Sequence, residues 1–114
     1  MANYVSNKEL LKEIIESKKR DELTPRAVEL ICKMSQEMSK VLKYKYPEDR
    51  EDCIASGIAD VIKHWRNFNP ERSENVFAYY TQVIKNGMAK TWNLIHQQKD
   101  SDFISIDDDI FRNI

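Results

Sequence analysis

Glycine and proline are scarce in this sequence, with 2 glycines and 3 prolines among 114 residues. A sheet of many strands needs tight turns, and these two residues supply most of the backbone conformations that such turns require. Leucine, glutamate, lysine and methionine, which favour helices, are well represented instead, as is isoleucine. The composition therefore predicts an all-α protein, and the 41% of hydrophobic residues is enough for the core of one domain.

Long apolar runs are also missing. No segment approaches the roughly 18 apolar residues that a membrane-spanning helix requires, and the first residues, MANYVSNKELLKEII, contain no uninterrupted apolar stretch of the kind found in signal peptides. We therefore expect a cytoplasmic protein without a membrane partner. The two cysteines, Cys32 and Cys53, show no CxxC spacing, so we expect two reduced, partly buried thiols and neither a zinc site nor a redox motif.

Patterns for catalysis or metal binding are absent as well. His64 and His96 each fall near the end of a predicted helix, where a cation complements the helix dipole. Asp107, Asp108 and Asp109 lack the interleaved glycine and the terminal glutamate of a calcium loop, so we interpret them as solvated charge. The sequence predicts neither an enzyme nor a bound cofactor or metal ion.

Apolar residues three and four positions apart predict a compact bundle of four helices, at about 7–19, 25–42, 47–65 and 76–98. Ser6 with Glu9 has the form of a capping box, while Thr24 followed by Pro25 is typical of an N-cap and first turn. The expected inner stripes of the last three helices are Ala27, Leu30, Ile31, Met34, Met38, Val41 and Leu42; Ile54, Ile58, Val61, Ile62 and Trp65; and Phe77, Tyr80, Val83, Ile84, Met88, Trp92 and Ile95.

The last fifteen residues differ from the predicted helical domain at 1–99. Segment 100–114 combines aspartates with isolated phenylalanines and isoleucines, and it forms an acidic and hydrophobic tail. Such a segment is either a short packed helix or a disordered peptide that folds when its apolar side chains enter a partner's groove. The residues alone favour neither alternative.

The predicted fourth helix is free of negative charge. Residues 76–99 contain no aspartate or glutamate, although the chain has 19 acidic residues and a net charge of −1. Amide side chains pair with base edges, lysines contact phosphates, and a tyrosine ring stacks on an unpaired base. We expect Tyr79 to point outward, whereas Phe77 and Tyr80 fit the inner stripe. The face opposite that stripe is therefore a predicted DNA-binding face, made of Tyr79, Gln82, Lys85, Asn86, Ala89, Lys90 and Asn93.

Two adjacent segments resemble region 2 of the sigma-70 family of transcription initiation factors. DCIASGIADVIKHWRNFN is similar to region 2.2 at Asp52, Ile54, Gly57, Lys63, Phe68 and Asn69, and the next segment is similar to regions 2.3 and 2.4 at Tyr79, Thr81, Ile84, Lys85 and Lys90. The late sigma factors of T-even-type phages are closer still, at Tyr4, Val5, Asn7, Lys8, Glu9, Leu10 and Leu11, and at Ala78, Tyr79, Thr81 and Gln82. This resemblance covers about residues 3–99.

The resemblance implies a non-enzymatic factor with two binding surfaces. Region 2.2 of the family docks on the clamp helices of the largest subunit of core RNA polymerase, which implies a polar interface at Asp52, Ser56, Asp60, Lys63 and Asn67. Regions 2.3 and 2.4 recognise the −10-like promoter element and hold its non-template strand. By this resemblance Tyr79 stacks at the melting edge, Asn86 and Ala89 face the upstream base pairs, and Lys85 and Lys90 contact the DNA backbone.

Departures from the family pattern restrict what is implied. Gln82 and Val83 replace the tandem tryptophans that brace the upstream edge of the bubble, so strand opening by this chain alone is not implied. The tail is similar in composition to the segment with which phage late factors bind the sliding clamp, and this similarity implies clamp contacts at Ile110 and Phe111 and cooperation with a co-activator. Two other hypotheses stay open: a polymerase-binding regulator of the anti-sigma or co-activator type that does not read DNA, and a helical interaction module unrelated to transcription.

Overall fold

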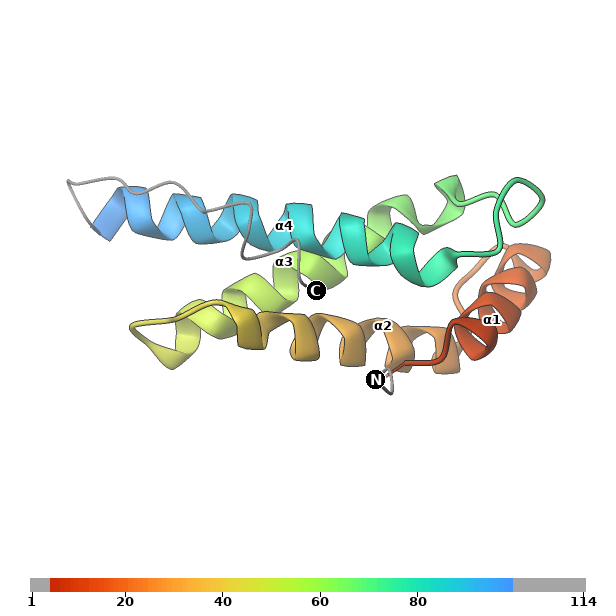
Figure 1. Cartoon of the computed structure of the whole chain (residues 1–114), viewed down its shortest axis with the longest axis horizontal. Helices are drawn as coiled ribbons and strands as arrows, with labels where there is room; N and C mark the ends of the chain where they lie inside the picture. The colour runs from red at the N-terminus through yellow and green to blue at the C-terminus, as the bar shows by residue number, and fades with distance from the viewer. Residues whose placement is uncertain (1–4, 100–114) are drawn as a thin grey trace.

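The computed structural model describes residues 5–99 of the chain, which form a bundle of four α-helices (Figure 1). The helices are α1 (Asn7–Arg20), α2 (Pro25–Met38), α3 (Pro47–His64) and α4 (Val76–Lys99), and short 3-10 helices follow α2 and α3. No strand occurs within residues 5–99. The prediction of an all-α bundle of four helices is confirmed.

Helix α1 begins at the residue that the sequence indicated and ends one residue later than predicted. The Ser6 hydroxyl accepts a hydrogen bond from the backbone N–H of Glu9 (3.4 Å), and Asp21 ends the helix in the left-handed conformation (φ 59°). Three basic residues in the last turn complement the helix dipole: Lys18, Lys19 and Arg20. The structure extends the predicted helix by one residue.

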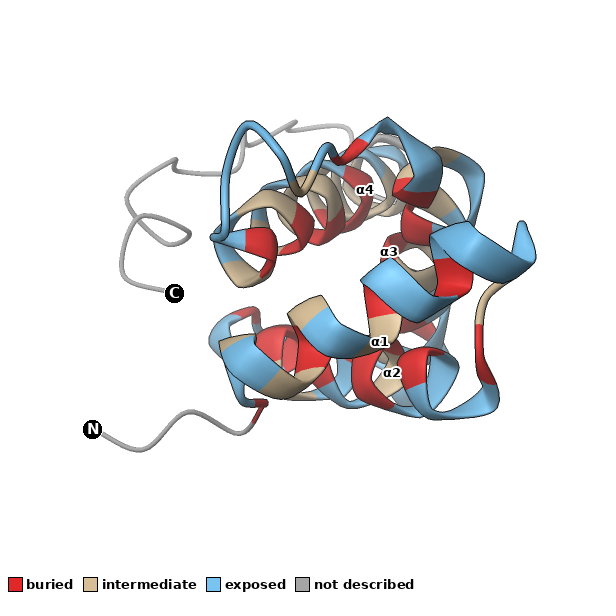
Figure 2. Cartoon of the chain, turned by 90° about the vertical axis from the view of Figure 1, so that its right-hand side faces the viewer, coloured by how far each residue is buried: buried red, intermediate tan, exposed pale blue. Residues whose placement is uncertain are grey.

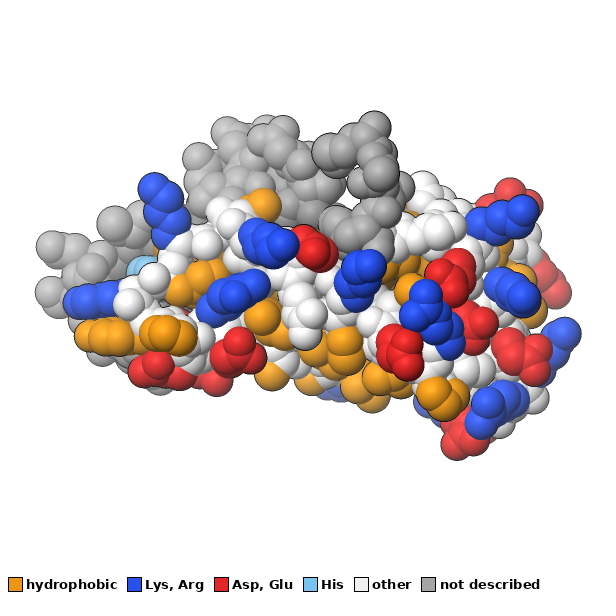
Figure 3. All heavy atoms as spheres, turned by 90° about the horizontal axis from the view of Figure 1, so that it is seen from below, with side chains coloured by type: hydrophobic (Ala, Val, Ile, Leu, Met, Phe, Trp, Pro, Cys, Tyr) orange, Lys and Arg blue, Asp and Glu red, His pale blue; other side chains and the backbone are white. Residues whose placement is uncertain are grey.

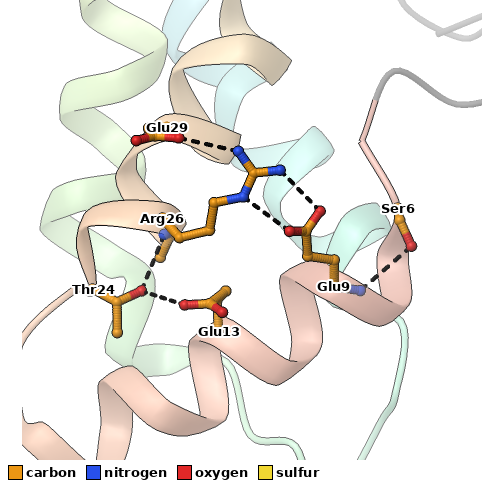
Figure 4. Close-up of polar contacts among 7 residues, drawn as sticks. Ser6, Glu9, Glu13, Thr24, Arg26 and Glu29 are labelled. Atoms are coloured by element: carbon orange, nitrogen blue, oxygen red, sulfur yellow. Dashed lines mark hydrogen bonds and ion pairs between the residues drawn. The ribbon is translucent and has the colours of Figure 1, made fainter.

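Helix α2 is joined to α1 by side chains near its start (Figure 4). The Thr24 hydroxyl accepts a hydrogen bond from the N–H of Ala27 (3.1 Å) and donates one to the Glu13 carboxylate (2.8 Å). The Arg26 guanidinium donates to both carboxylate oxygens of Glu9 (2.9 and 3.2 Å). The N-cap predicted at Thr24 is therefore confirmed, and it also ties α2 to α1.

The end of α2 departs from the predicted pattern. The chain tightens into a 3-10 helix at Ser39–Val41 before Leu42. Val41, which the periodicity placed in the inner stripe, is 41% exposed. That prediction was wrong because a 3-10 turn holds about three residues, so a side chain after it no longer follows the α-helical period.

Helix α3 buries Cys53, Ile54 and Val61, and a 3-10 helix at Trp65–Asn67 follows it. Ile62 was also predicted to face the core, but it is 48% exposed. Successive residues of an α-helix diverge by about 100°. Val61 points into the core, and the turn of about 100° to the next residue places Ile62 on the solvent side of α3.

The core lies where α4 crosses α3 and α2, and buried residues line the facing sides of these helices (Figure 2). Tyr80, Ile84 and Met88 of α4 are fully buried. Two glycines allow the close approach. A Cβ atom on Gly57 would lie 2.8 Å from Ile84 Cγ2, and one on Gly87 would lie 3.0 Å from the Ser56 carbonyl oxygen. Helices α3 and α4 therefore meet at a contact that larger side chains would obstruct.

Candidate nucleic-acid interface

The start of α4 is fixed by amide and hydroxyl side chains. Asn75 Oδ1 accepts a hydrogen bond from the N–H of Ala78 (3.1 Å), and the Ser73 hydroxyl accepts one from the N–H of Asn75 (3.1 Å). From α1, Asn7 Oδ1 accepts from the N–H of Phe77 (2.9 Å), while its Nδ2 donates to the Glu74 carbonyl oxygen (3.0 Å). These bonds occupy N–H groups of the first turn, which the helix itself leaves without acceptors.

The predicted DNA-binding face is exposed along only part of its width. Gln82, Asn86 and Lys90 are exposed, and Gln82 Nε2 donates to Asn86 Oδ1 (3.0 Å). The other predicted members of the face are half-buried: Tyr79, Lys85, Ala89 and Asn93. The accessible centre of this face is therefore an amide pair followed by a lysine.

Tyr79 does not stand free in solvent. Its ring centroid lies 5.5 Å from that of Phe68 and 5.8 Å from that of Tyr80. The prediction that Tyr79 points outward was wrong, because the segment after α3 folds back and packs Phe68 on the ring. The tyrosine also borders a hollow of about 290 Å³, which is lined by Asn67, Phe68, Asn69, Arg72, Ser73, Asn75 and Tyr79.

The two neighbouring aromatics differ in burial. Tyr80 is fully buried and its hydroxyl donates to the Trp65 carbonyl oxygen (3.1 Å), so its predicted place in the core is confirmed. Burial raises the pKa of the Tyr80 phenol above its ordinary value. Phe77 is half-buried against the core.

A carboxylate from α3 approaches the helix that has no acidic residue of its own. Asp60 Oδ2 lies 3.7 Å from Lys90 Nζ, and a Cβ atom on Gly87 would lie 2.7 Å from the same oxygen. The Lys90 side chain is 66% exposed and that of Asp60 24% exposed. The positive charge of this face is therefore partly balanced across the α3–α4 contact, which the sequence of α4 alone did not show.

The five predicted polymerase-docking residues do not share one free face. Asp52, Lys63 and Asn67 are exposed. Ser56 and Asp60 are half-buried and turn toward α4, where the Ser56 hydroxyl lies 2.5 Å from the Thr91 hydroxyl. Positions 56 and 60 are one helical turn apart on the flank of α3 that faces α4. Ser56 and Asp60 therefore offer less accessible surface than the other three residues, and the polar docking interface stays a prediction.

A second hollow, of about 780 Å³, lies between α1 and the segment after α3, and its lining includes Lys18, Lys19 and Arg66. The Arg66 guanidinium donates to the Asp21 carboxylate (3.1 Å) and to its carbonyl oxygen (2.7 Å). It also lies 4.5 Å from the centroid of the Trp65 ring. In the view of Figure 3, basic and acidic side chains are intermixed at the α1 end of the molecule. Positive charge is not segregated on that surface.

The histidines and cysteines have packing roles. The His96 ring stacks on Trp92 (3.5 Å between centroids), and its Nδ1 lies 2.9 Å from the Trp92 carbonyl oxygen. His64 and Cys32 are half-buried, and Cys53 is fully buried. Burial raises the pKa of the Cys53 thiol to about 11. A thiol with so high a pKa is poorly suited to act as a nucleophile at neutral pH.

The described residues show neither a metal-binding cluster nor a membrane-spanning helix. They contain no group of three or more histidine, cysteine, aspartate or glutamate side chains that could hold a metal ion. Within the same part of the chain, no helix is both long and apolar enough to cross a membrane. The tail residues considered for clamp binding or charge lie outside the described residues: Asp107, Asp108, Asp109, Ile110 and Phe111.

Some contributors to this interface were not predicted. Asn7 sits 70 positions before Phe77, and no local pattern in either segment indicates that they meet. Asp60 was predicted only as a docking residue, and its approach to Lys90 was not predicted. Asn75 was predicted only as part of a polar loop, although an asparagine just before a helix is a known N-cap signal.

Comparison with known proteins adds no relative: no protein-family model, no curated protein and no solved structure matches this chain. The similarity of residues 3–99 to sigma region 2 therefore stays a prediction from the sequence.

Proposed function

We propose that this protein is a sigma-like transcription initiation factor that binds core RNA polymerase and recognises the −10-like element of promoters of the phage late type. One observation carries the proposal. The two segments that resemble regions 2.2 and 2.4 are the two helices that pack against each other through Gly57 and Gly87, and the second presents exposed amides on a helix without acidic residues.

DNA recognition in this proposal uses the exposed strip of α4. Gln82 and Asn86 offer amide groups that pair with base edges, and Lys90 offers a cation for the phosphate backbone. An unpaired base enters the hollow beside Tyr79, where Arg72 supplies charge and the half-buried ring supplies a stacking surface. Because Phe68 packs against the Tyr79 ring and lines the same hollow, the ring is already held in place, and stacking costs little conformational entropy.

Polymerase docking uses the outward face of α3. The exposed residues between Asp52 and Lys63 include Ala55 and Ala59, whose small side chains let another helix approach closely. Acidic residues occupy the first turns of α3 and basic residues its last turn. A partner helix with the opposite order of charges matches this face. Asp52, Lys63 and Asn67 remain the docking residues of the proposal.

In this proposal the tail at 100–114 binds the sliding clamp. Ile110 and Phe111 follow three aspartates and supply apolar side chains for the groove of a sliding clamp, to which a co-activator adds. Deleting 100–114 is then expected to remove clamp-stimulated transcription while leaving polymerase binding intact.

The test has two stages. The full chain is first incubated with bacterial core RNA polymerase and recovered by pull-down. Run-off transcription from an AT-rich −10-like promoter follows, with sliding clamp and co-activator present. We expect binding and promoter-dependent transcripts, and we expect Asn86→Ala with Lys90→Glu to suppress the transcripts without reducing polymerase binding. Lys33→Glu, at an exposed position of α2, is the matched control for the charge change.

A regulator that binds polymerase without reading DNA is the second candidate. The observations that favour it are the approach of Asp60 to Lys90 and the packing of Tyr79 on Phe68, since both reduce what α4 offers to DNA. Polymerase binding with no promoter-dependent transcript selects this candidate. Failure to bind polymerase at all contradicts both candidates and leaves a helical interaction module unrelated to transcription.

A further inference from the structure

We propose that Asn7 is the positioning residue for Tyr79, and that α1 thereby shapes the hollow in which an unpaired base is held. The inference rests on the proposed function. Asn7 itself does not line the hollow. The lining comes from Asn67, Tyr79 and the segment between α3 and α4.

Asn7 uses both ends of one amide to fix the chain on either side of Asn75. Its Nδ2 donates to the Glu74 carbonyl oxygen (3.0 Å), and its Oδ1 accepts from the N–H of Phe77 (2.9 Å). Tyr79 follows two residues later on the first turn of α4. The start of α4, which carries the Tyr79 ring, is thus bonded to α1.

Helix α1 also bonds to the other end of the segment that connects α3 to α4. Lys18 Nζ donates to the Arg66 carbonyl oxygen (2.9 Å), and the Arg66 guanidinium binds Asp21 at the end of α1. Asn7 and Lys18 lie at the two ends of α1, and they hold the two ends of the segment between α3 and α4. The spacing of Phe68 and Tyr79, 5.5 Å between ring centroids, therefore depends on α1.

The chemistry of an amide explains why asparagine suits this position. Asparagine is the shorter of the two side chains that end in an amide, and an amide carries its donor and its acceptor on two separate atoms. The segment needs one of each. Aspartate keeps the acceptor for the Phe77 N–H and loses the donor to Glu74. Alanine loses both bonds and releases the start of α4.

Three variants of the full chain separate positioning from general stability. Asn7→Ala removes both bonds, and Asn7→Asp retains the bond to Phe77. Thr24→Ala is the matched control, because the Thr24 hydroxyl caps α2 and bonds to Glu13 of α1. All three are compared by thermal melting, so that losses of stability can be matched.

Two measurements test the proposal. Without DNA, NMR of the ring-labelled tyrosines and the exchange rate of the Phe77 amide report on Tyr79 and its turn. With core polymerase, the fluorescence of 2-aminopurine in a single-stranded oligonucleotide reports on base stacking. We expect Asn7→Ala to shift the Tyr79 signal, to speed amide exchange and to weaken oligonucleotide binding roughly tenfold, the scale of one lost stacking contact. Asn7→Asp should recover most of these losses.

Each outcome gives a decision. An unchanged Tyr79 signal in Asn7→Ala overturns the positioning role, whether or not the chain binds DNA. Equal losses of oligonucleotide binding in Asn7→Ala and Thr24→Ala overturn it as well, because a general loss of stability then explains both. If the unsubstituted chain binds polymerase but not the oligonucleotide, DNA recognition fails, while the shift of the Tyr79 signal still measures positioning.

Discussion

The two helix pairs of this bundle are joined in different ways. Helices α1 and α2 are connected by polar side chains near the surface, among them the Arg26 guanidinium on the Glu9 carboxylate. Helices α3 and α4 meet through Gly57 and Gly87, where backbone and side-chain atoms leave no space for a Cβ atom. The first connection tolerates adjustment of long side chains, whereas the second depends on close fit.

This difference indicates which pair holds the candidate interface in place. An exposed ion pair contributes little, because water and salt screen it and long side chains lose entropy when they are fixed. A tight helix crossing has few alternative arrangements, because interiors are close-packed. The arrangement of the outward face of α3 relative to the exposed strip of α4 is therefore set by the glycine contact and much less by the surface charges.

The largest effect is expected from Gly57→Ala. The added Cβ atom would lie 2.7 Å from Ser35 Oγ and 2.8 Å from Ile84 Cγ2, and Ser35 Oγ also donates to the Ile54 carbonyl oxygen (2.9 Å). We expect the free energy of unfolding in urea to fall by about 1–3 kcal/mol, as for other overpacked cores. Adding Ser35→Ala should recover part of this loss. Unchanged or increased stability of Gly57→Ala would show that the crossing is not tightly packed.

An intermediate effect is expected at alkaline pH. Burial raises the pKa of the Cys53 thiol from 9.0 to about 11, so the folded state holds this proton more tightly than the unfolded state does. The resulting stability is fully present below pH 9 and is lost as the pH rises toward 11. Melting temperature measured with a reductant should therefore decline over this range, and the decline should be shallower in Cys53→Ala. Identical pH profiles for the two proteins would contradict the burial of this thiol.

The smallest effect on stability is expected from a change at the contact between α1 and α2. Arg26→Ala removes the ion pairs with Glu9 and Glu29, and the guanidinium lies at the surface. We expect a change in melting temperature close to the error of the measurement, and a smaller change still in high salt. The Arg26 hydrogen bond lowers the pKa of Glu9, so any stabilisation is lost as the pH falls below the ordinary range of a carboxylate. A loss as large as that of Gly57→Ala would remove the distinction between the two pairs.

Much of the fold follows from local patterns. The helix starts at Asn7, Pro25 and Pro47 agree with the capping and proline signals, because those signals act within one turn of the chain. The errors, at Val41 and Ile62, arose where periodicity was extended through a 3-10 turn and to both members of an adjacent apolar pair. Periodicity identifies a face of a helix but does not resolve the edges of that face.

Less of the candidate site follows from the sequence. The acid-free character of α4 can be read directly, but Asp60 reaches Lys90 from another helix and Phe68 covers one side of Tyr79 from the preceding segment. Both contacts depend on how α3 crosses α4, which no pattern within one helix specifies. Asn7 is the extreme case, since its two bonds to the start of α4 join the beginning of the domain to its longest helix.

Gly87 lies near the middle of α4, eleven residues after Val76 and twelve before Lys99. With a rise of about 1.5 Å per residue, each end of the helix is roughly 17 Å from this point. The crossing with α3 therefore lies near the midpoint of α4. A small change of the angle between α3 and α4 would therefore move Tyr79 and the end of α4 near Lys99 in opposite directions.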